Sequence, residues 1–434
     1  MARASRPTRR LARVSFVHAF RRNALCFSAL WLSALGCSHT ETTTPAPVEA
    51  SAPSASSAPD ASLDPIAQVM APKIAIGNLN ADIDMREKQM GRTPPDAESL
   101  LRYVDLLLAH AQFAGKVSDL EKADRVTLAN LPRLVGDGGA HLARANALGG
   151  VHKFDAALSE LAQAEKSGAE PIRISEARAA IFTAVGRFDD AFAIRAKADE
   201  SILPITALAA RAELAGEMQK PDECDRLFAE ARGKVRDGSP FTVAWMDFEH
   251  AQLLERRGDR ARAKNIFAEA NRILPTFAHA TVHLAALETP ENAVAILTPL
   301  LDATDDPDVL AAMADALRRS GKTNDATAMQ ARATARYEEL LAKYPEAFAD
   351  HAAAFFLGPN GDVKRALTLA QINEKIRKTE PAIELLLTPA MASNNHDATC
   401  AAAKDGAGLA YSSTGFRANI APLLAGCGGD AGVK

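Results

Sequence analysis

Aromatic residues are scarce in this chain, which has four Tyr, two Trp and 17 Phe among its 434 residues. β-Sheets favour aromatic and β-branched side chains, so the scarcity of rings disfavours a sheet protein. It also disfavours a surface that stacks sugars on aromatic side chains. Alanine is abundant instead, and alanine-rich helices form readily and pack closely on one another. The composition therefore indicates an all-α protein.

Sequence motifs of the common enzyme classes are missing. The chain has no His-Glu-x-x-His, no Gly-x-Ser-x-Gly and no glycine-rich phosphate loop after a strand. No pair of carboxylates and no Cys/His arrangement stands at a catalytic spacing. The sequence thus predicts no catalytic residues, no cofactor and no metal, and we expect a protein that is not an enzyme.

A basic surface is missing as well. Residues 1–36 contain seven of the 50 Lys and Arg and none of the 54 Asp and Glu, so the remainder carries a net charge near −11. Nonspecific nucleic-acid binding needs clustered positive charge. We therefore expect no nucleic-acid partner, and the acidic body is typical of a long solenoid kept soluble by its charge.

The longest apolar run near the N-terminus covers residues 24–35, follows a basic segment, and ends just before Gly36-Cys37-Ser38. Twelve residues are too few to span a bilayer but suit the apolar core of a signal peptide. The run and its cysteine resemble a bacterial lipoprotein signal. The resemblance implies that residues 1–36 are removed and that an acylated Cys37 anchors the protein in a lipid bilayer.

The residue after this cysteine bears on the expected location. Ser38 stands where Asp would imply retention in the inner membrane. By this resemblance we expect an outer-membrane lipoprotein of the cell envelope, on the periplasmic face or at the cell surface. A secretory signal cleaved elsewhere and an uncleaved anchor remain open. Residues 37–65 are rich in Ser, Thr, Ala and Pro, a composition that predicts a disordered tether.

Small residues recur with a period of about 34 after residue 96, while residues 66–95 are expected to form a separate N-terminal helix. Ala123, Ala157 and Ala191 are spaced by 34 and 34, as are Phe154 and Phe188. Such a period predicts stacked helix pairs in which a small residue allows close backbone contact. Nine positions carry the pattern, here named the slot residues: Ala123, Ala157, Ala191, Cys224, Ala263, Ala293, Ala326, Ala366 and Cys400.

The pattern resembles the tetratricopeptide-repeat family over residues 96–405. Its second-helix signature is matched in the fifth pair by Gly258, Ala263, Phe267, Ala270 and Pro275. The resemblance implies a tetratricopeptide-like helical-hairpin solenoid, a right-handed superhelix whose concave groove binds a protein or peptide. Residues 406–434 would form a capping helix and tail. The residues we expect to line the groove are Arg144, Arg178, Arg211, His250 and His279.

Three further sets of residues are candidates for chemistry. Cys400 and Cys427 lie on adjacent expected helices and are candidates for a disulfide, or are two unrelated thiols. His279 and His283 have a metal-compatible spacing on one helix, but we expect two groove histidines rather than ligands. The run from Asp305 to Asp308 resembles a calcium loop and is more simply read as a helix N-cap.

The sequence thus predicts an envelope-tethered tetratricopeptide scaffold that mediates protein–protein interactions. Two alternatives stay open at this point. One is a structural envelope protein associated with peptidoglycan. The other is a noncatalytic subunit of an envelope enzyme complex.

Overall fold

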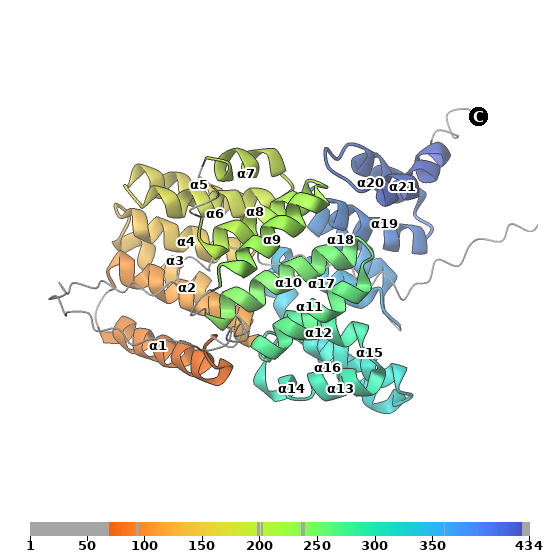
Figure 1. Ribbon diagram of the computed structural model, residues 1–434, viewed down its shortest axis with the longest axis horizontal. Coiled ribbons are helices and arrows are strands. Elements are labelled where there is room, and N and C mark those ends of the chain that lie inside the picture. Colours follow the sequence, from red (N-terminus) through yellow and green to blue (C-terminus); the bar gives the residue numbers. More distant parts are fainter. Residues whose placement is uncertain are drawn as a thin grey trace, which may run out of the picture.

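The computed structural model describes residues 69–92, 95–197, 200, 203–235, 239–359 and 361–427. The expected signal peptide, Cys37 and the expected tether lie outside these ranges. Within them every regular element is a helix, as Figure 1 shows. No helix of this described part is long and apolar enough to cross a membrane.

A single helix, α1 (Pro72–Arg92), precedes a series of helical hairpins. The hairpins are α2 (Ala97–Ala114) with α3 (Ser118–Asn130), α4 (Gly138–Gly150) with α5 (Phe154–Lys166), α6 (Pro171–Ala184) with α7 (Phe188–Arg195), α8 (Ile205–Glu217) with α9 (Pro221–Gly233), α10 (Pro240–Arg256) with α11 (Arg260–Ile273), α12 (Ala278–Leu287) with α13 (Pro290–Leu297), α15 (Pro307–Arg319) with α16 (Thr323–Lys343), α17 (Pro345–Phe356) with α18 (Val363–Ile376), and α19 (Glu380–Ala392) with α20 (His396–Ala407). The helix α21 (Thr414–Gly426) follows them.

The slot residues explain why the helices pair in this way. Eight of the nine are buried in the second helices of their hairpins, at 0–1% exposure. Methyl groups and one thiol at these positions let the backbones of the paired helices approach closely, which is the contact that defines each hairpin. The ninth, Cys400, is partly exposed and bonded to another cysteine. The chain is therefore an all-α solenoid of helical hairpins, as the sequence predicts.

A left-handed turn residue stands five residues before the slot residue in five hairpins. Gly186, Gly258 and Gly321 stand five residues before their slot residues, with φ of 85°, 89° and 78°. Glycine adopts such angles without the penalty that a Cβ atom imposes. His152 and Gln219 occupy the same turn position in two other hairpins, with φ of 56° and 60°. The fold therefore imposes the turn even where the sequence carries a side chain.

Two short elements differ from the regular hairpin pattern. A 3-10 turn, η4 (Leu131–Arg133), follows α3, and a one-turn helix, α14 (Leu300–Ala303), follows α13. The sequence predicts a single helix over residues 291–301, but α13 ends at Leu297 and Pro299 caps α14. Proline lacks the backbone N–H that a helix interior needs, which explains the break.

The solenoid curls until its first hairpin meets its later ones. The ring of Phe113, at the end of α2, lies 5.0 Å from that of Phe241 and 5.3 Å from that of Phe277. The backbone N–H of Asp305 donates to the carbonyl of Gly115 at 3.0 Å. These contacts join residues that are more than 100 positions apart, and they bring α2 against α10 and α12.

This curling fills the middle of the molecule with the chain's own side chains. The buried residues of α10 include Trp245 and Phe248 and come from every face of the helix. Most of α2 is buried in the same way. A helix buried on all faces offers no surface to a ligand. The ligand-binding groove expected from the sequence therefore cannot be lined by α10.

Candidate functional site

A groove of about 400 Å³ opens between α12, α15, α16 and α17. Its walls are mainly alanine methyl groups, with Val282, Phe355 and Leu357 among the larger apolar side chains. Alanine is placed here by the close packing of the first helices, and its short side chain leaves space between them. The alanines that line the groove are Ala285, Ala286, Ala311, Ala312, Ala314 and Ala354.

The floor of the groove is polar and comes from three helices. Asp308 lies in the first turn of α15, Tyr337 on α16 and His351 on α17. The Tyr337 hydroxyl donates to Oδ1 of Asp308, and His351 Nδ1 donates to Oδ2 of the same carboxylate. The carboxylate is thus held from both sides, which fixes the three helices relative to one another.

Neighbouring charges set the protonation states of Asp308 and His351. Burial by itself would lower the pKa of His351, but the carboxylates of Asp308 and Asp350 outweigh it and raise that pKa to about 10. Burial would likewise raise the pKa of Asp308, but the His351 charge and hydrogen bond hold it well below its usual range. At neutral pH the pair is an imidazolium and a carboxylate, so His351 cannot accept a proton as a general base.

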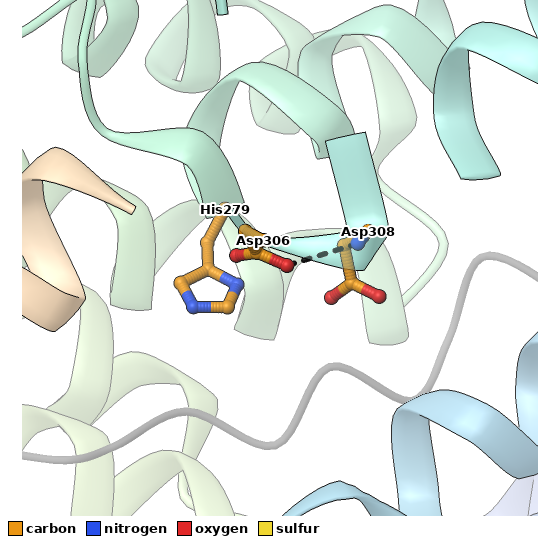
Figure 2. A group of neighbouring side chains, drawn as sticks. All are labelled: His279, Asp306 and Asp308. Carbon is orange, nitrogen blue, oxygen red and sulfur yellow. Dashed lines mark hydrogen bonds between the residues drawn. The ribbon is translucent and has the colours of Figure 1, made fainter. Parts of the chain in front are cut away.

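A second, smaller cavity of about 20 Å³ touches the same floor from the side of α2. Its polar lining includes His279, Asp306 and Asp308, the three side chains that Figure 2 shows facing one another. One donor atom from each of these residues lies within 4.8 Å of the others. This is the set of described residues with the geometry of a metal-ligand cluster.

The backbone at this point is that of a capped helix. Asp306 is the N-cap of α15 and its Oδ1 accepts from the backbone N–H of Asp308 at 2.9 Å. The N-cap interpretation of this acidic run is therefore confirmed. Burial, with the nearby charge of Asp308, raises the pKa of Asp306 to about 7. Burial, with the charge of His351, lowers the pKa of His279 to about 4, so this imidazole is neutral at neutral pH.

Two arginines on α15 form the rim of the groove. Arg319 pairs with Asp315 at 2.8 Å and donates to the carbonyls of Glu288 and Ala285 at the end of α12. Arg318 donates to Oε1 of Gln330 at 2.6 Å, and no carboxylate of the described residues pairs with it. One guanidinium at the rim thus keeps its charge uncompensated.

The structure places the five residues expected to line a groove in different surroundings. Arg144 is part-buried and pairs with Asp124 at 2.6 Å, while Arg178 pairs with Glu165 at 2.8 Å. Arg211 donates to the backbone carbonyl of Arg195.

The two histidines of that set differ from each other. His250 lies 3.3 Å from Asp225 and stacks on Phe228. His279 borders the small cavity, and its ring lies near those of Phe248, Phe277 and His351. His283, four residues later, turns to Glu255 at 3.0 Å instead. The structure therefore separates the two histidines that the sequence spacing pairs and brings His279 to the acidic run.

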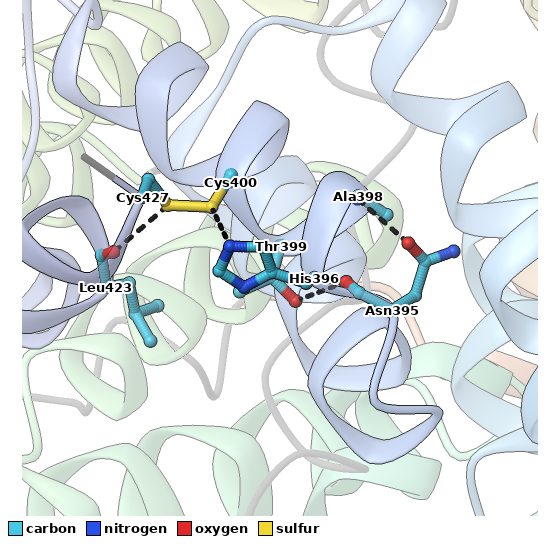
Figure 3. The surroundings of a disulfide bond; sticks show 7 residues. All are labelled: Asn395, His396, Ala398, Thr399, Cys400, Leu423 and Cys427. Carbon is cyan, nitrogen blue, oxygen red and sulfur yellow. Dashed lines mark hydrogen bonds between the residues drawn. A yellow bond between two sulfur atoms is a disulfide. The ribbon is translucent and has the colours of Figure 1, made fainter. Parts of the chain in front are cut away.

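The cysteines also have distinct places. Cys400 on α20 and Cys427, just after α21, are joined by a disulfide, as Figure 3 shows. Cys224 is buried in its slot, and burial raises the pKa of its thiol to about 12. A thiol with such a pKa is unreactive at neutral pH, as expected for a packing residue.

Sequence reasoning missed Asp308 as a site residue, together with Tyr337, His351 and Arg318. They lie on α15, α16 and α17, far apart in the sequence. Tyr337 is 29 residues after Asp308 and His351 is 43 residues after it, separations that match no local motif. The sequence itself offers one local signal for this site, the adjacent acidic and imidazole side chains of Asp350 and His351.

Among known proteins, this chain is similar to solved structures of helical-repeat proteins. No family model and no curated protein matches this chain. The crystal structure of yeast Tom70 covers 81% of this chain and 86% of its own at 14% identity and a TM-score of 0.42. A structure of the APC/C heterotetramer Cut9–Hcn1 covers 75% of this chain and 63% of its own at 11% identity, with a TM-score of 0.38.

A third structure, the P58(IPK) TPR domain, covers 81% of this chain and 95% of its own, with 14% identity and a TM-score of 0.26. These scores are too low to transfer a shape or a binding site. The assignment of the fold therefore rests on the hairpins and slot residues of this chain.

Proposed function

We propose that this chain is an envelope-tethered scaffold that binds a segment of a partner protein in the groove between α12, α15, α16 and α17. The groove itself carries the proposal. Its volume of about 400 Å³ lies in the range of ligand-binding pockets, and apolar walls with a few polar groups are typical of such sites.

The chemistry of the groove specifies the kind of segment. The alanine walls present short methyl groups and leave open volume for apolar side chains of a ligand. Arg318 supplies a positive charge at the rim without an acidic partner among the described residues. A carboxylate on the ligand would gain a charge-assisted hydrogen bond there. The segment we propose is extended, small and apolar, with one acidic residue.

Crosslinking in intact cells tests the groove. A photo-crosslinking amino acid placed at Ala312, inside the groove, should capture one dominant protein. The same amino acid at the exposed Lys166 of α5 is the matched control and should capture none at that level. Arg318→Glu should remove the Ala312 crosslink because it reverses the rim charge. Equal crosslinking from both positions, or cosedimentation with peptidoglycan alone, would contradict the proposal.

The tether is a separate part of the proposal and is supported by the residues around Cys37. Cys37→Ser should shift the protein from the membrane fraction to the soluble fraction, since it removes the acylated side chain. Cys26→Ser lies in the apolar run before it and should leave the protein in the membrane fraction. Membrane association that survives Cys37→Ser would refute acylation at this residue while leaving the groove proposal intact.

A further inference from the structure

We propose that His279, Asp306 and Asp308 bind a divalent cation of the transition series, for which Zn²⁺ is a suitable probe. The inference goes beyond the scaffold function and does not depend on it. One donor atom from each residue lies within 4.8 Å of the others, and the three residues come from two hairpins. Zinc binds nitrogen and oxygen donors at about 2.0–2.2 Å, so donor atoms that lie up to 4.8 Å apart must move closer together to bind one ion.

The two carboxylates are already oriented by outer hydrogen bonds. Asp306 Oδ1 accepts from the backbone N–H of Asp308 at 2.9 Å, so it is fixed by the start of α15. Asp308 accepts from the Tyr337 hydroxyl and from His351 Nδ1, which come from α16 and α17. Metal-binding carboxylates are typically held by such outer partners, which reduces the cost of arranging them around the ion.

His279 provides an observation that is independent of the acidic run. In the described residues its ring contacts Phe248, Phe277 and His351, and no hydrogen bond to either of its nitrogens is present. A partly exposed imidazole with free nitrogens beside two carboxylates has unused donor capacity. A metal ion would bind to a free nitrogen of this imidazole and connect the first turn of α12 to the first turn of α15.

Charge and space both favour a cation at this point. Three carboxylates gather here, those of Asp306, Asp308 and Asp350, whereas the cations beside them are His351 and Arg377. The carboxyl groups outnumber the cations at this point, which favours a cation over an anion. The small cavity of about 20 Å³ has room for a single water molecule or ion. Calcium and magnesium prefer oxygen donors alone, whereas an imidazole suits zinc and its neighbours.

The ion would have only three protein donors, which leaves a position for water or for a group of the bound partner. Asp308 borders the large groove as well as the small cavity. An ion held at this carboxylate would therefore stiffen the floor of the groove from behind.

Calorimetry on the chelator-treated protein tests the site. Zn²⁺ should bind with one tight site, and the melting temperature should rise with Zn²⁺ concentration because the ion binds the folded state. His279→Gln should weaken the tight site at least about 100-fold, more than loss of an outer-shell partner does. His250→Gln is the matched control, since His250 also faces an aspartate but on another hairpin, and it should leave the tight site unchanged.

Folding of each variant is checked by circular dichroism. If His279→Gln does not fold, Asp306→Asn replaces it, because an amide can still accept the N-cap hydrogen bond. Substitution with Co²⁺ gives a second readout, a visible absorption band that should disappear in the folded ligand variant. The proposal is overturned if the wild-type protein binds no Zn²⁺ at micromolar concentration, or if the His279 and Asp306 variants bind it as tightly as the wild type.

Discussion

Arg377 and Asp350 form an ion pair at 2.7 Å whose side chains are 1% and 0% exposed. The same guanidinium lies 3.1 Å from the nitrogens of His152, 225 residues earlier in the chain. His152 Nδ1 in turn lies 3.1 Å from the carbonyl of Glu346 at the start of α17. One buried arginine therefore joins the turn of the second hairpin to the eighth hairpin and helps to close the solenoid on itself.

Removing this arginine should be costly. Arg377→Met leaves the buried Asp350 carboxylate without its closest cationic partner, and breaking a buried pair in this way costs about 3–5 kcal/mol. The free energy of unfolding from urea denaturation measures the loss. The double variant Arg377→Met, Asp350→Asn serves as the control and should recover part of it, since no buried charge remains unpaired. A loss below about 1 kcal/mol for the single variant would show that the closure contributes little.

Lowering the pH should stabilise the folded protein through one buried carboxyl group in the first hairpin. Asp105 on α2 is 3% exposed, accepts from Asn146 and Arg173, and burial raises its pKa to about 6. Because this is above the unfolded value of about 3.9, the folded state binds the proton more tightly, and this contribution to stability grows as the pH falls from 7 to 5.

The variant Asp105→Asn removes that titration. Relative to wild type, we expect the variant to lose about 1 kcal/mol of stability between pH 7 and pH 5, measured by urea denaturation at each pH. Asp84→Asn changes an exposed carboxylate on α1 and should show no such trend. A stability difference that is the same at both pH values would contradict the assignment to Asp105.

A glycine in the turn before α9 should stabilise the folded protein. Gln219 is exposed and has a φ of 60°, an angle at which a Cβ atom is penalised. Gln219→Gly should raise the free energy of unfolding by up to about 1 kcal/mol. Gln371→Gly makes the same substitution at an exposed position inside α18 and should instead cost about 1 kcal/mol. Destabilisation by both variants would mean that the Gln219 side chain makes an offsetting contact.

The disulfide between Cys400 and Cys427 should stabilise the C-terminal end of the solenoid. It closes a loop across a sequence separation of 27, for which the chain-entropy relation gives about 3–4 kcal/mol. Without reductant, both cysteines should resist alkylation in the denatured protein, whereas Cys224 should react. Reduction should increase amide exchange in α20 and α21 while leaving α4 and α5 unchanged. Alkylation of all three cysteines before reduction would exclude the bond.

Several features of the fold could be predicted from the sequence because they depend on residues close in the chain. The 34-residue spacing of Ala123, Ala157 and Ala191 identifies the hairpins, and all three are fully buried. Asp96 and Asp306 act as N-caps, a role decided within three residues of each. Helix pairing in a solenoid is a contact between neighbours, so the local pattern contains most of the information that it needs.

Which residues meet in the interior and at the candidate site depends on the tertiary structure alone. A repeat pattern specifies how one hairpin stacks on the next but not how far the stack curls, because small rotations at each step accumulate. That curl places Phe113 against Phe277, Arg377 against His152, and His279 beside Asp306 and Asp308. The sequence by itself determined an all-α stack of hairpins. Only the accumulated curvature decided which of their polar side chains meet.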